Sequence, residues 1–119
     1  MNIEYFRDYC LAKPGVEEGF PFGPDTIVLK VMGKMFALSS LSSPWLSVNL
    51  KCDPERALEL RDEYESVKPG YHMNKQHWNT ISFESSSIPD KLFLELVDHS
   101  YELVVASLTK KLKEELKNL

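Results

Sequence analysis

The residues with the richest chemistry are gathered in one stretch, PGYHMNKQHWNT, at positions 69 to 80. It contains two histidines, a lysine, a tyrosine and a tryptophan, and it has no acidic residue. Lysine can hold a phosphate, an aromatic ring can stack on a base, and asparagine or histidine can hydrogen-bond a base edge. The stretch therefore predicts a surface site for nucleic acid, with a hairpin that merely carries large side chains as the alternative.

Other chemistries need spacings that this chain lacks. His72 and His77 are five residues apart and would fall on opposite sides of a simple strand, while Cys10 and Cys52 belong to no CxxC pair. The glycines match neither the dinucleotide-binding pattern nor the P-loop pattern. We therefore expect no metal site, no cofactor and no enzymatic reaction, and we expect both cysteines to be free, buried thiols.

Charge is unevenly distributed along the chain. The 119 residues hold 14 bases and 18 acids, which gives a net charge of −4. Residues 26–52 and 66–83 contain five lysines and no acid, so these stretches carry +5 and the remainder carries −9. Part of this pattern follows from the rarity of acids in strands. It also predicts that one side of the molecule is less acidic than the other.

These residues must be positioned by a mixture of helices and short strands. Helical spacing of apolar residues predicts helices over residues 3–12, 53–64 and from 90 nearly to the end, with a corner near Asp98 as an alternative to one continuous last helix. In the second helix Arg61 shares a face with Ala57 and Leu60. Alternation predicts strands over residues 26–31, 34–40, 45–51, 67–73 and 78–84. The segment 16–26 is expected to be an ordered loop anchored by Phe20 and Phe22.

The order of elements, α-β-β-β-α-β-β-α, predicts a single two-layer α+β domain over residues 1–119, with a mostly antiparallel sheet and the helices on one face. The other face of the sheet would be partly solvated. Strand alternation places Trp45 and Trp78 on that uncovered face, and it turns Ile81, Phe83 and Asn79 toward the core. The tryptophans suit base stacking, with the cover of a secondary core as the alternative role.

Targeting signals are missing from the sequence. The first ten residues, MNIEYFRDYC, include acids and no apolar run. No apolar segment is long enough to span a bilayer. We therefore expect a cytoplasmic protein with no membrane partner.

Several stretches resemble the MmcQ/YjbR family of small bacterial proteins. They are PFG (21–23), VMGKMFAL (31–38), VNLKCDPE (48–55), LR (60–61), PGYHMNKQHWNT (69–80) and DHSYELV (98–104), and they span nearly the whole chain. The pattern PGYHMNK-x-HWNT is the most specific of them. The resemblance implies a frataxin-like (CyaY-like) or secretion-chaperone-like α+β fold. It also implies DNA binding through a double-wing arrangement of hairpins, with no assigned reaction.

Together, the residues and the resemblance predict a DNA-binding surface on the hairpins. Its candidate contacts are Lys34, Asn49, Lys51, Lys68, Tyr71, His72, Asn74, Lys75, His77, Trp78 and Asn79. The lysines would meet phosphates, while His77, Trp78 and Asn79 would contact bases or sugars. Two rival functions stay open. One is a secretion-chaperone-like module whose open sheet face binds a protein partner or forms a homodimer, and the other is a small-molecule site built from Tyr71, His72, Trp78 and Asn79.

Overall fold

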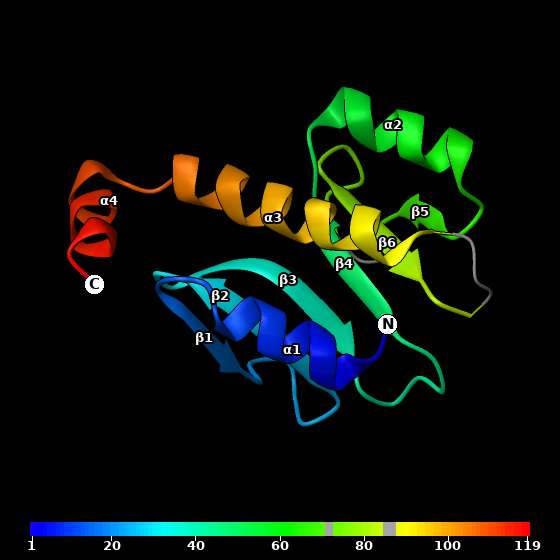
Figure 1. The fold of residues 1–119 in the computed structure, drawn as a ribbon, viewed down its shortest axis with the longest axis horizontal. Helices are drawn as coiled ribbons and strands as arrows, with labels where there is room; N and C mark the ends of the chain where they lie inside the picture. The colour runs from blue at the N-terminus through cyan, green and yellow to red at the C-terminus, as the bar shows by residue number, and fades with distance from the viewer. Residues whose placement is uncertain (71–72, 85–87) are drawn as a thin grey trace.

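The computed structural model describes residues 1–70, 73–84 and 88–119. Figure 1 shows the helices and strands of these residues in chain order: α1 (Ile3–Leu11), β1 (Val16–Gly19), β2 (Thr26–Val31), β3 (Lys34–Ser40), β4 (Ser47–Lys51), α2 (Pro54–Glu63), β5 (Val67–Pro69), β6 (Trp78–Ser82), α3 (Asp90–Ala106) and α4 (Lys110–Lys117). The molecule measures 40 × 32 × 26 Å. Along its longest axis, α4 lies at one end, and α2, β5 and β6 lie toward the other (Figure 1).

One antiparallel sheet runs through the molecule in the strand order β1-β2-β3-β4-β6-β5. β4 pairs with β6 although α2 and β5 come between them in the chain, so β5 becomes an edge strand. Met32 and Gly33 form the tight turn between β2 and β3, and both have positive φ angles, 49° and 84°. Two such residues are typical of a type I′ hairpin turn. The predicted α+β fold with a mostly antiparallel sheet is confirmed.

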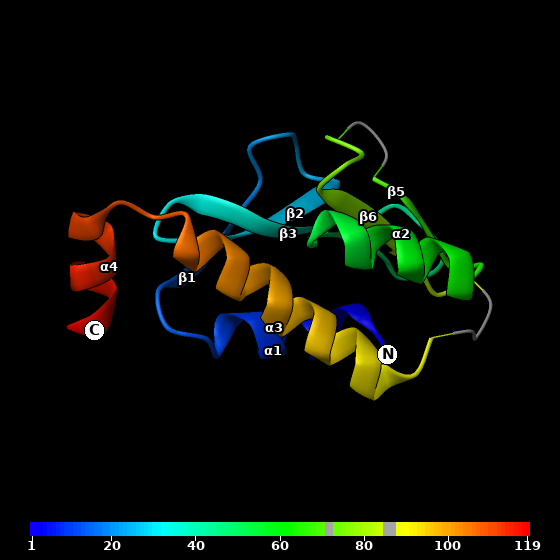
Figure 2. The same ribbon diagram turned by 90° about the horizontal axis from the view of Figure 1, so that it is seen from above.

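The helices α1, α2 and α3 pack on one face of the sheet (Figure 2). Phe6 of α1, Leu60 of α2 and Phe93 of α3 are buried there against sheet residues such as Leu29 and Ile81. Removing these apolar side chains from water is the main force that holds the two layers together. Within the described ranges, no helix combines the length and the apolar character needed to cross a bilayer.

Residues 16–19 form β1, although the sequence predicts a loop there. β1 is an edge strand with β2 as its one neighbour, so its acidic side chains can stay outside the core. Glu18 pairs with Arg7 of α1, with 2.6 Å between Nη2 and Oε1. The predicted anchoring by Phe20 and Phe22 is wrong, because their side chains are 48% and 67% exposed.

Three other elements end or begin where the sequence did not predict. β4 begins at Ser47 and β5 ends at Pro69, so both are shorter than expected. The last helix breaks between Ala106 and Lys110, not near Asp98. Asp98 is tolerated inside α3 because its carboxylate accepts hydrogen bonds from Tyr9, at 2.8 Å, and from Lys13. A polar side chain with a tertiary partner does not compete with the helix backbone.

Both cysteines are free and buried, as predicted. Burial raises the pKa of the Cys10 thiol to about 12 and also raises the pKa of Cys52. Both thiols therefore stay protonated at neutral pH, which makes them weak nucleophiles. In the described part of the chain, no three His, Cys, Asp or Glu residues lie close enough together to share a metal ion.

Candidate functional site

The open face, which is the face of the sheet turned away from the helices, carries rows of side chains that run across the strands. Residues that pair directly in an antiparallel sheet project to the same side. The central row consists of Val28, Leu38, Asn49, Thr80 and Lys68. A row of hydroxyl side chains lies to one side of it and consists of the pairs Thr26 with Ser40 and Ser47 with Ser82. On the other side, Lys51 pairs with Trp78.

A groove of about 380 Å³ lies across this open face. Its floor is formed by six side chains of the central and hydroxyl rows, namely Thr26, Leu38, Ser40, Ser47, Asn49 and Thr80. Its walls are Phe22, from the loop between β1 and β2, and Met73, from the loop between β5 and β6. Figure 2 shows the loop between β1 and β2, and the described residues of the loop between β5 and β6, on the side of the sheet opposite α1 and α3. The hollow follows from side-chain size, because serine and threonine project less far from a sheet than phenylalanine and methionine do.

Asn49 offers a hydrogen-bond donor in the floor of the groove. The hydroxyl of Thr80 donates to its Oδ1 atom, which fixes the orientation of the side-chain amide. The Nδ2 group of Asn49 has no hydrogen-bond partner among the described residues. Asn49 therefore presents an N–H donor to whatever enters the groove.

Arg61 of α2 holds the loop between β5 and β6 in place. Its Nε atom donates to Oδ1 of Asn79 at 2.7 Å, and its Nη2 atom donates to the carbonyl groups of Lys75 and Trp78. Asn74 closes the turn from within, because its carbonyl accepts from the amides of His77 and Trp78 at 3.1 and 2.9 Å. The sequence signal for this role is an arginine that shares a helix face with Ala57 and Leu60.

Two predicted contacts are buried and need correction. Asn79 is 2% exposed and faces the helices, where its side chain accepts a hydrogen bond from Arg61 and donates one to the carbonyl of Ala57. Trp78 is 9% exposed and packs beside Gly70, where an added Cβ would lie 2.8 Å from the Cβ of Trp78. Neither side chain offers a free surface for base contacts, and both instead hold β6 and its loop in position.

The remaining predicted contacts among the described residues lie in three places. Asn49, Lys51 and Lys68 are brought together on the open face, and exposed Asn74 and Lys75 with half-buried His77 belong to the loop that supplies Met73. Lys34 lies apart from them, at the turn between β2 and β3, where its Nζ donates to the carbonyl of Ser107 at 3.4 Å. Tyr71 and His72 lie outside the described residues.

The sheet and the helices α1 to α3 carry opposite charge. Strands β2 to β6 contain four lysines and no acid and the edge strand β1 adds two glutamates, whereas α1, α2 and α3 together contain ten acids and four bases. The predicted segregation of charge along the sequence thus becomes a basic sheet backed by an acidic helical layer. An anionic ligand would be attracted to the open face and repelled from the helical side.

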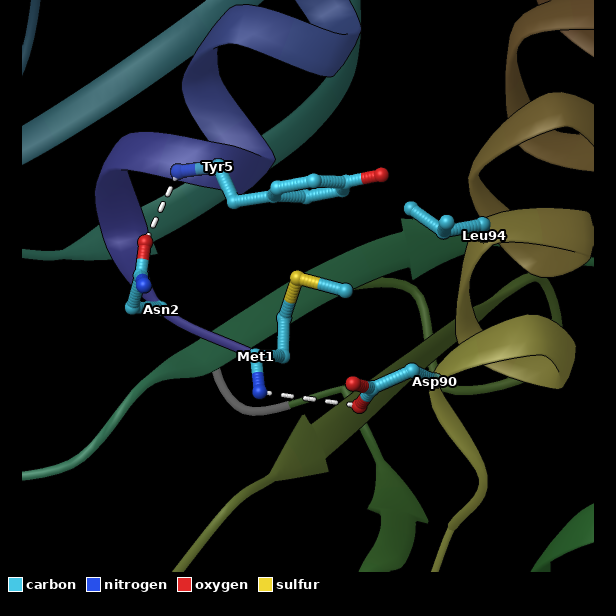
Figure 3. A pocket seen from close by; sticks show the side chains of 5 residues that line it. All are labelled: Met1, Asn2, Tyr5, Asp90 and Leu94. Atoms are coloured by element: carbon cyan, nitrogen blue, oxygen red, sulfur yellow. Dashed lines mark hydrogen bonds and ion pairs between the residues drawn. The ribbon is translucent and has the colours of Figure 1, made fainter.

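Two other hollows lack this combination of features. One, of about 320 Å³, lies where α1 and α3 begin, and Figure 3 shows Met1, Tyr5 and Leu94 facing one another there, with Asp90 held 3.6 Å from the amino group of Met1. It contains none of the predicted contacts. The other lies beside β5, where Arg61 and Lys68 are balanced by Glu65 and Glu84.

Comparison with known proteins places the chain among relatives of the same size. Residues 11–103 match the family model described as YjbR. The chain is 41% identical over 108 residues to the uncharacterized protein YbdF of Escherichia coli O157:H7. The aligned region covers 91% of this chain and 88% of YbdF. It is 36% identical over 105 residues to the uncharacterized protein YjbR of Escherichia coli K12, with 88% of each covered.

Solved structures give the same picture. The fold is similar to the crystal structure of Deinococcus radiodurans protein DR2400, with a TM-score of 0.91 and 38% identity, covering 98% of this chain and 88% of that one. It is also similar to the crystal structure of a Pseudomonas syringae protein, with a TM-score of 0.74 and 27% identity, covering 87% and 98% of the two chains. The similarity therefore includes nearly all of the sheet and helices described above.

Proposed function

Because this chain belongs to the YjbR family, and the names of its relatives give no activity, we propose a function from the geometry of its own open face. The protein binds single-stranded nucleic acid there, with an unpaired base in the groove and phosphates on the neighbouring lysines. The observation that carries this proposal is the groove between two loops, on the face whose strands contain lysines and no acid in β2 to β6.

The size and the lining of the groove suit a base. Its volume of about 380 Å³ lies near the lower end of the range for small-ligand pockets. Phe22 is 67% exposed, so its ring is available for stacking, which is the sequence-tolerant way in which proteins hold unpaired bases. The Nδ2 group of Asn49 and the serine hydroxyls supply hydrogen bonds to base or sugar atoms.

The lysines beside the groove would provide the electrostatic part of the affinity. Lys68 follows Thr80 in the central row, and Lys51 lies two residues beyond Asn49 on the same face of β4. Both can reach phosphates of a strand whose base occupies the groove. Because each phosphate contact releases counterions, binding of this kind weakens steeply as salt is added.

Fluorescence anisotropy with a labelled random single strand of about 12 nucleotides tests this proposal, in salt of about 50 and about 200 mM. We expect salt-dependent binding that is tighter than to the matching duplex. The double variant Lys51→Gln, Lys68→Gln should make the log–log salt slope shallower by about 1.4, from about 0.7 per contact. Lys91→Gln, an exposed lysine on the helical side, is the control and should change nothing. A folded wild-type protein that fails to bind at low salt would contradict the proposal.

A protein-binding module is the second candidate, and one observation favours it. Phe20, Phe22 and Leu41 are exposed apolar side chains in two loops that are joined by a 2.7 Å hydrogen bond from the amide of Leu41 to the carbonyl of Asp25. Exposed aromatic residues suit interface contacts as well as base stacking. Light scattering that showed a salt-insensitive dimer, lost in Phe22→Ala, would favour this candidate over nucleic acid.

A further inference from the structure

A second positively charged surface lies far from the groove, where α4 meets the turn between β2 and β3. The hydroxyl of Thr109 accepts from the amide of Leu112 and caps the start of α4. Leu116 packs against Gly15, where an added Cβ would lie only 2.7 Å from Leu116 Cδ1, and Leu116 also packs against the core cluster. Lys34 joins this corner through its bond to the carbonyl of Ser107. The apolar side of α4 is therefore docked on the body of the protein, which turns its polar side outward.

The outward side of α4 carries a stripe of lysines. Lys110, Lys113 and Lys117 follow one another at helical spacings of three and four residues, which places them on one face, and all three are exposed. We call these three residues together with Lys34 the basic patch. In the described residues, none of its four lysines forms an ion pair with a carboxylate. Its charge is therefore not neutralised by an ion pair, although Glu114 lies on the same helix.

The charge of this corner stands out from that of the rest of the chain. α4 and Lys34 together hold five lysines and two glutamates, which is +3, whereas the remaining residues sum to −7. α4 also lies beyond residues 11–103, the range that the family model matches. Three of the four lysines of the basic patch, those on α4, thus lie outside the range that the family model matches.

The basic patch and the groove are connected by one strand. β3 begins at Lys34 and ends at Ser40, which lines the groove. Six residue steps at about 3.4 Å each separate the two ends by roughly 20 Å. A nucleic-acid strand at the stacked spacing of about 3.4 Å per nucleotide needs about six nucleotides to cover that distance.

We propose that the basic patch is a second phosphate-binding surface, which engages the same nucleic-acid strand whose base lies in the groove. This inference rests on the proposed function. It predicts that strands longer than about six nucleotides bind more tightly than short ones, because only they reach α4.

An anionic membrane would also be attracted by these lysines, but the geometry favours nucleic acid. A helix that lies on a membrane inserts its apolar side among the lipids. In α4 that side is occupied, because Leu112 and Leu116 are partly buried and Leu116 packs against Gly15. What remains available is charge, which suits a phosphate backbone.

The test measures binding of single strands of about 5 and about 15 nucleotides to the wild type and to the triple variant Lys110→Gln, Lys113→Gln, Lys117→Gln. We expect the variant to bind the long strand roughly tenfold more weakly than the wild type does at low salt, with a log–log salt slope shallower by about 2. Binding of the short strand should not change. The matched triple variant with arginine at the same positions should bind like the wild type, because it keeps the charges.

Controls separate the possible failures. Lys34→Gln leaves α4 intact and should still make the slope for the long strand shallower by about 0.7, which guards against a loss caused by unfolding of α4. If the wild type binds both strands and neither variant alters the slope for the long one, the inference is overturned while the proposed function stands. If the triple glutamine variant lost binding to phosphatidylserine vesicles but bound the long strand as the wild type does, the inference would be overturned in favour of a membrane-binding surface. If the wild type binds no strand, both proposals fail together.

Discussion

Asn49 and Asn79 lie on neighbouring strands of the same sheet, yet they project from opposite faces and differ in burial and in hydrogen bonding. Asn79 is turned toward the helices, where Arg61 and the carbonyl of Ala57 satisfy both ends of its buried amide. Asn49 is turned to the open face, where Thr80 occupies its oxygen and its Nδ2 group stays available in the groove. The residue type is the same, so the difference is made by what lies above each face. The covered face is built for stability, and the open face leaves polar groups for a ligand.

The largest expected effect is on stability, from a pair of leucines on adjacent strands. Leu50 is buried on the covered face, and Leu38 is half-buried in the groove. Leu50→Ala should lower the free energy of unfolding by about 2 to 5 kcal/mol, because it leaves a cavity in the core. Leu38→Ala should cost less than about half as much. Urea unfolding of the two variants checks this, and equal losses would contradict the division between the two faces.

The asparagine pair should behave in the same way on a smaller scale. Asn79→Ala leaves Arg61 without its buried partner and should lower the free energy of unfolding by about 1 to 3 kcal/mol. Asn49→Ala should change it by no more than about 0.5 kcal/mol, while it weakens binding of a single strand. Thermal unfolding and anisotropy on both variants give the comparison. A destabilised Asn49→Ala protein would show that Asn49 has a structural role.

The effect of Phe22 should appear in binding alone. Because its ring is 67% exposed, Phe22→Ala should leave the melting temperature unchanged. Loss of a stacked base should weaken single-strand binding by about 5- to 150-fold. Leu58→Ala removes an equally exposed apolar side chain from α2 and serves as the control, since it lies in the acidic helical layer. Equal losses from the two variants would argue against a base in the groove.

The smallest expected effect is a dependence of stability on pH through His99, on the helical side. Its Nε2 atom accepts from the amide of Asp53 at 3.2 Å, and burial, followed by the positive charge of Arg56, lowers the pKa of His99 below its ordinary value of 6.5, while Asp53 and Glu102 oppose the shift. The unfolded chain therefore takes up its proton at a higher pH than the folded one. Stability should be full above pH 6.5 and decline as the pH falls through that value.

We expect this loss to stay below about 1 kcal/mol, because the imidazole is partly exposed to solvent. His99→Gln keeps an acceptor for the Asp53 amide but does not titrate, so its stability should vary less between about pH 5.5 and about pH 7.5. Denaturant unfolding at a series of pH values measures the difference. Parallel curves for the two proteins would remove His99 as the cause.

Much of the fold could be predicted from the sequence because it depends on local patterns. Alternation correctly turned Ile81 toward the core, and the helix predicted over residues 53–64 matches α2, Pro54–Glu63. The strand VEEG was missed, because its two glutamates are acceptable only at a sheet edge, and edge position is decided by pairing with distant residues. The corner expected as an alternative near Asp98 does not form for a related reason, since the partners that hold Asp98 inside α3 are Tyr9 of α1 and Lys13, which are distant in the sequence.

The candidate site was predictable only in outline. Asn49, Lys51 and Lys68 were identified as contacts and do lie together on the open face. The groove itself was not predicted, because its depth depends on small hydroxyl side chains standing next to one another on four strands, and its walls depend on where two loops fold. Alternation did turn Asn79 toward the core, which conflicts with its choice as a base contact, whereas the burial of Trp78 could not be predicted, because it depends on contact with Gly70.

The most direct test of the central claim is a map of the surface on which nucleic acid binds. Amide chemical shifts of the isotope-labelled protein would be recorded during titration with a single strand of about 12 nucleotides. We predict that the largest changes occur at Leu38, Asn49, Thr80 and Lys68, around the groove, with little change in α2. Changes concentrated on the helices, or no changes at any residue, would contradict the assignment of the open face as the binding surface.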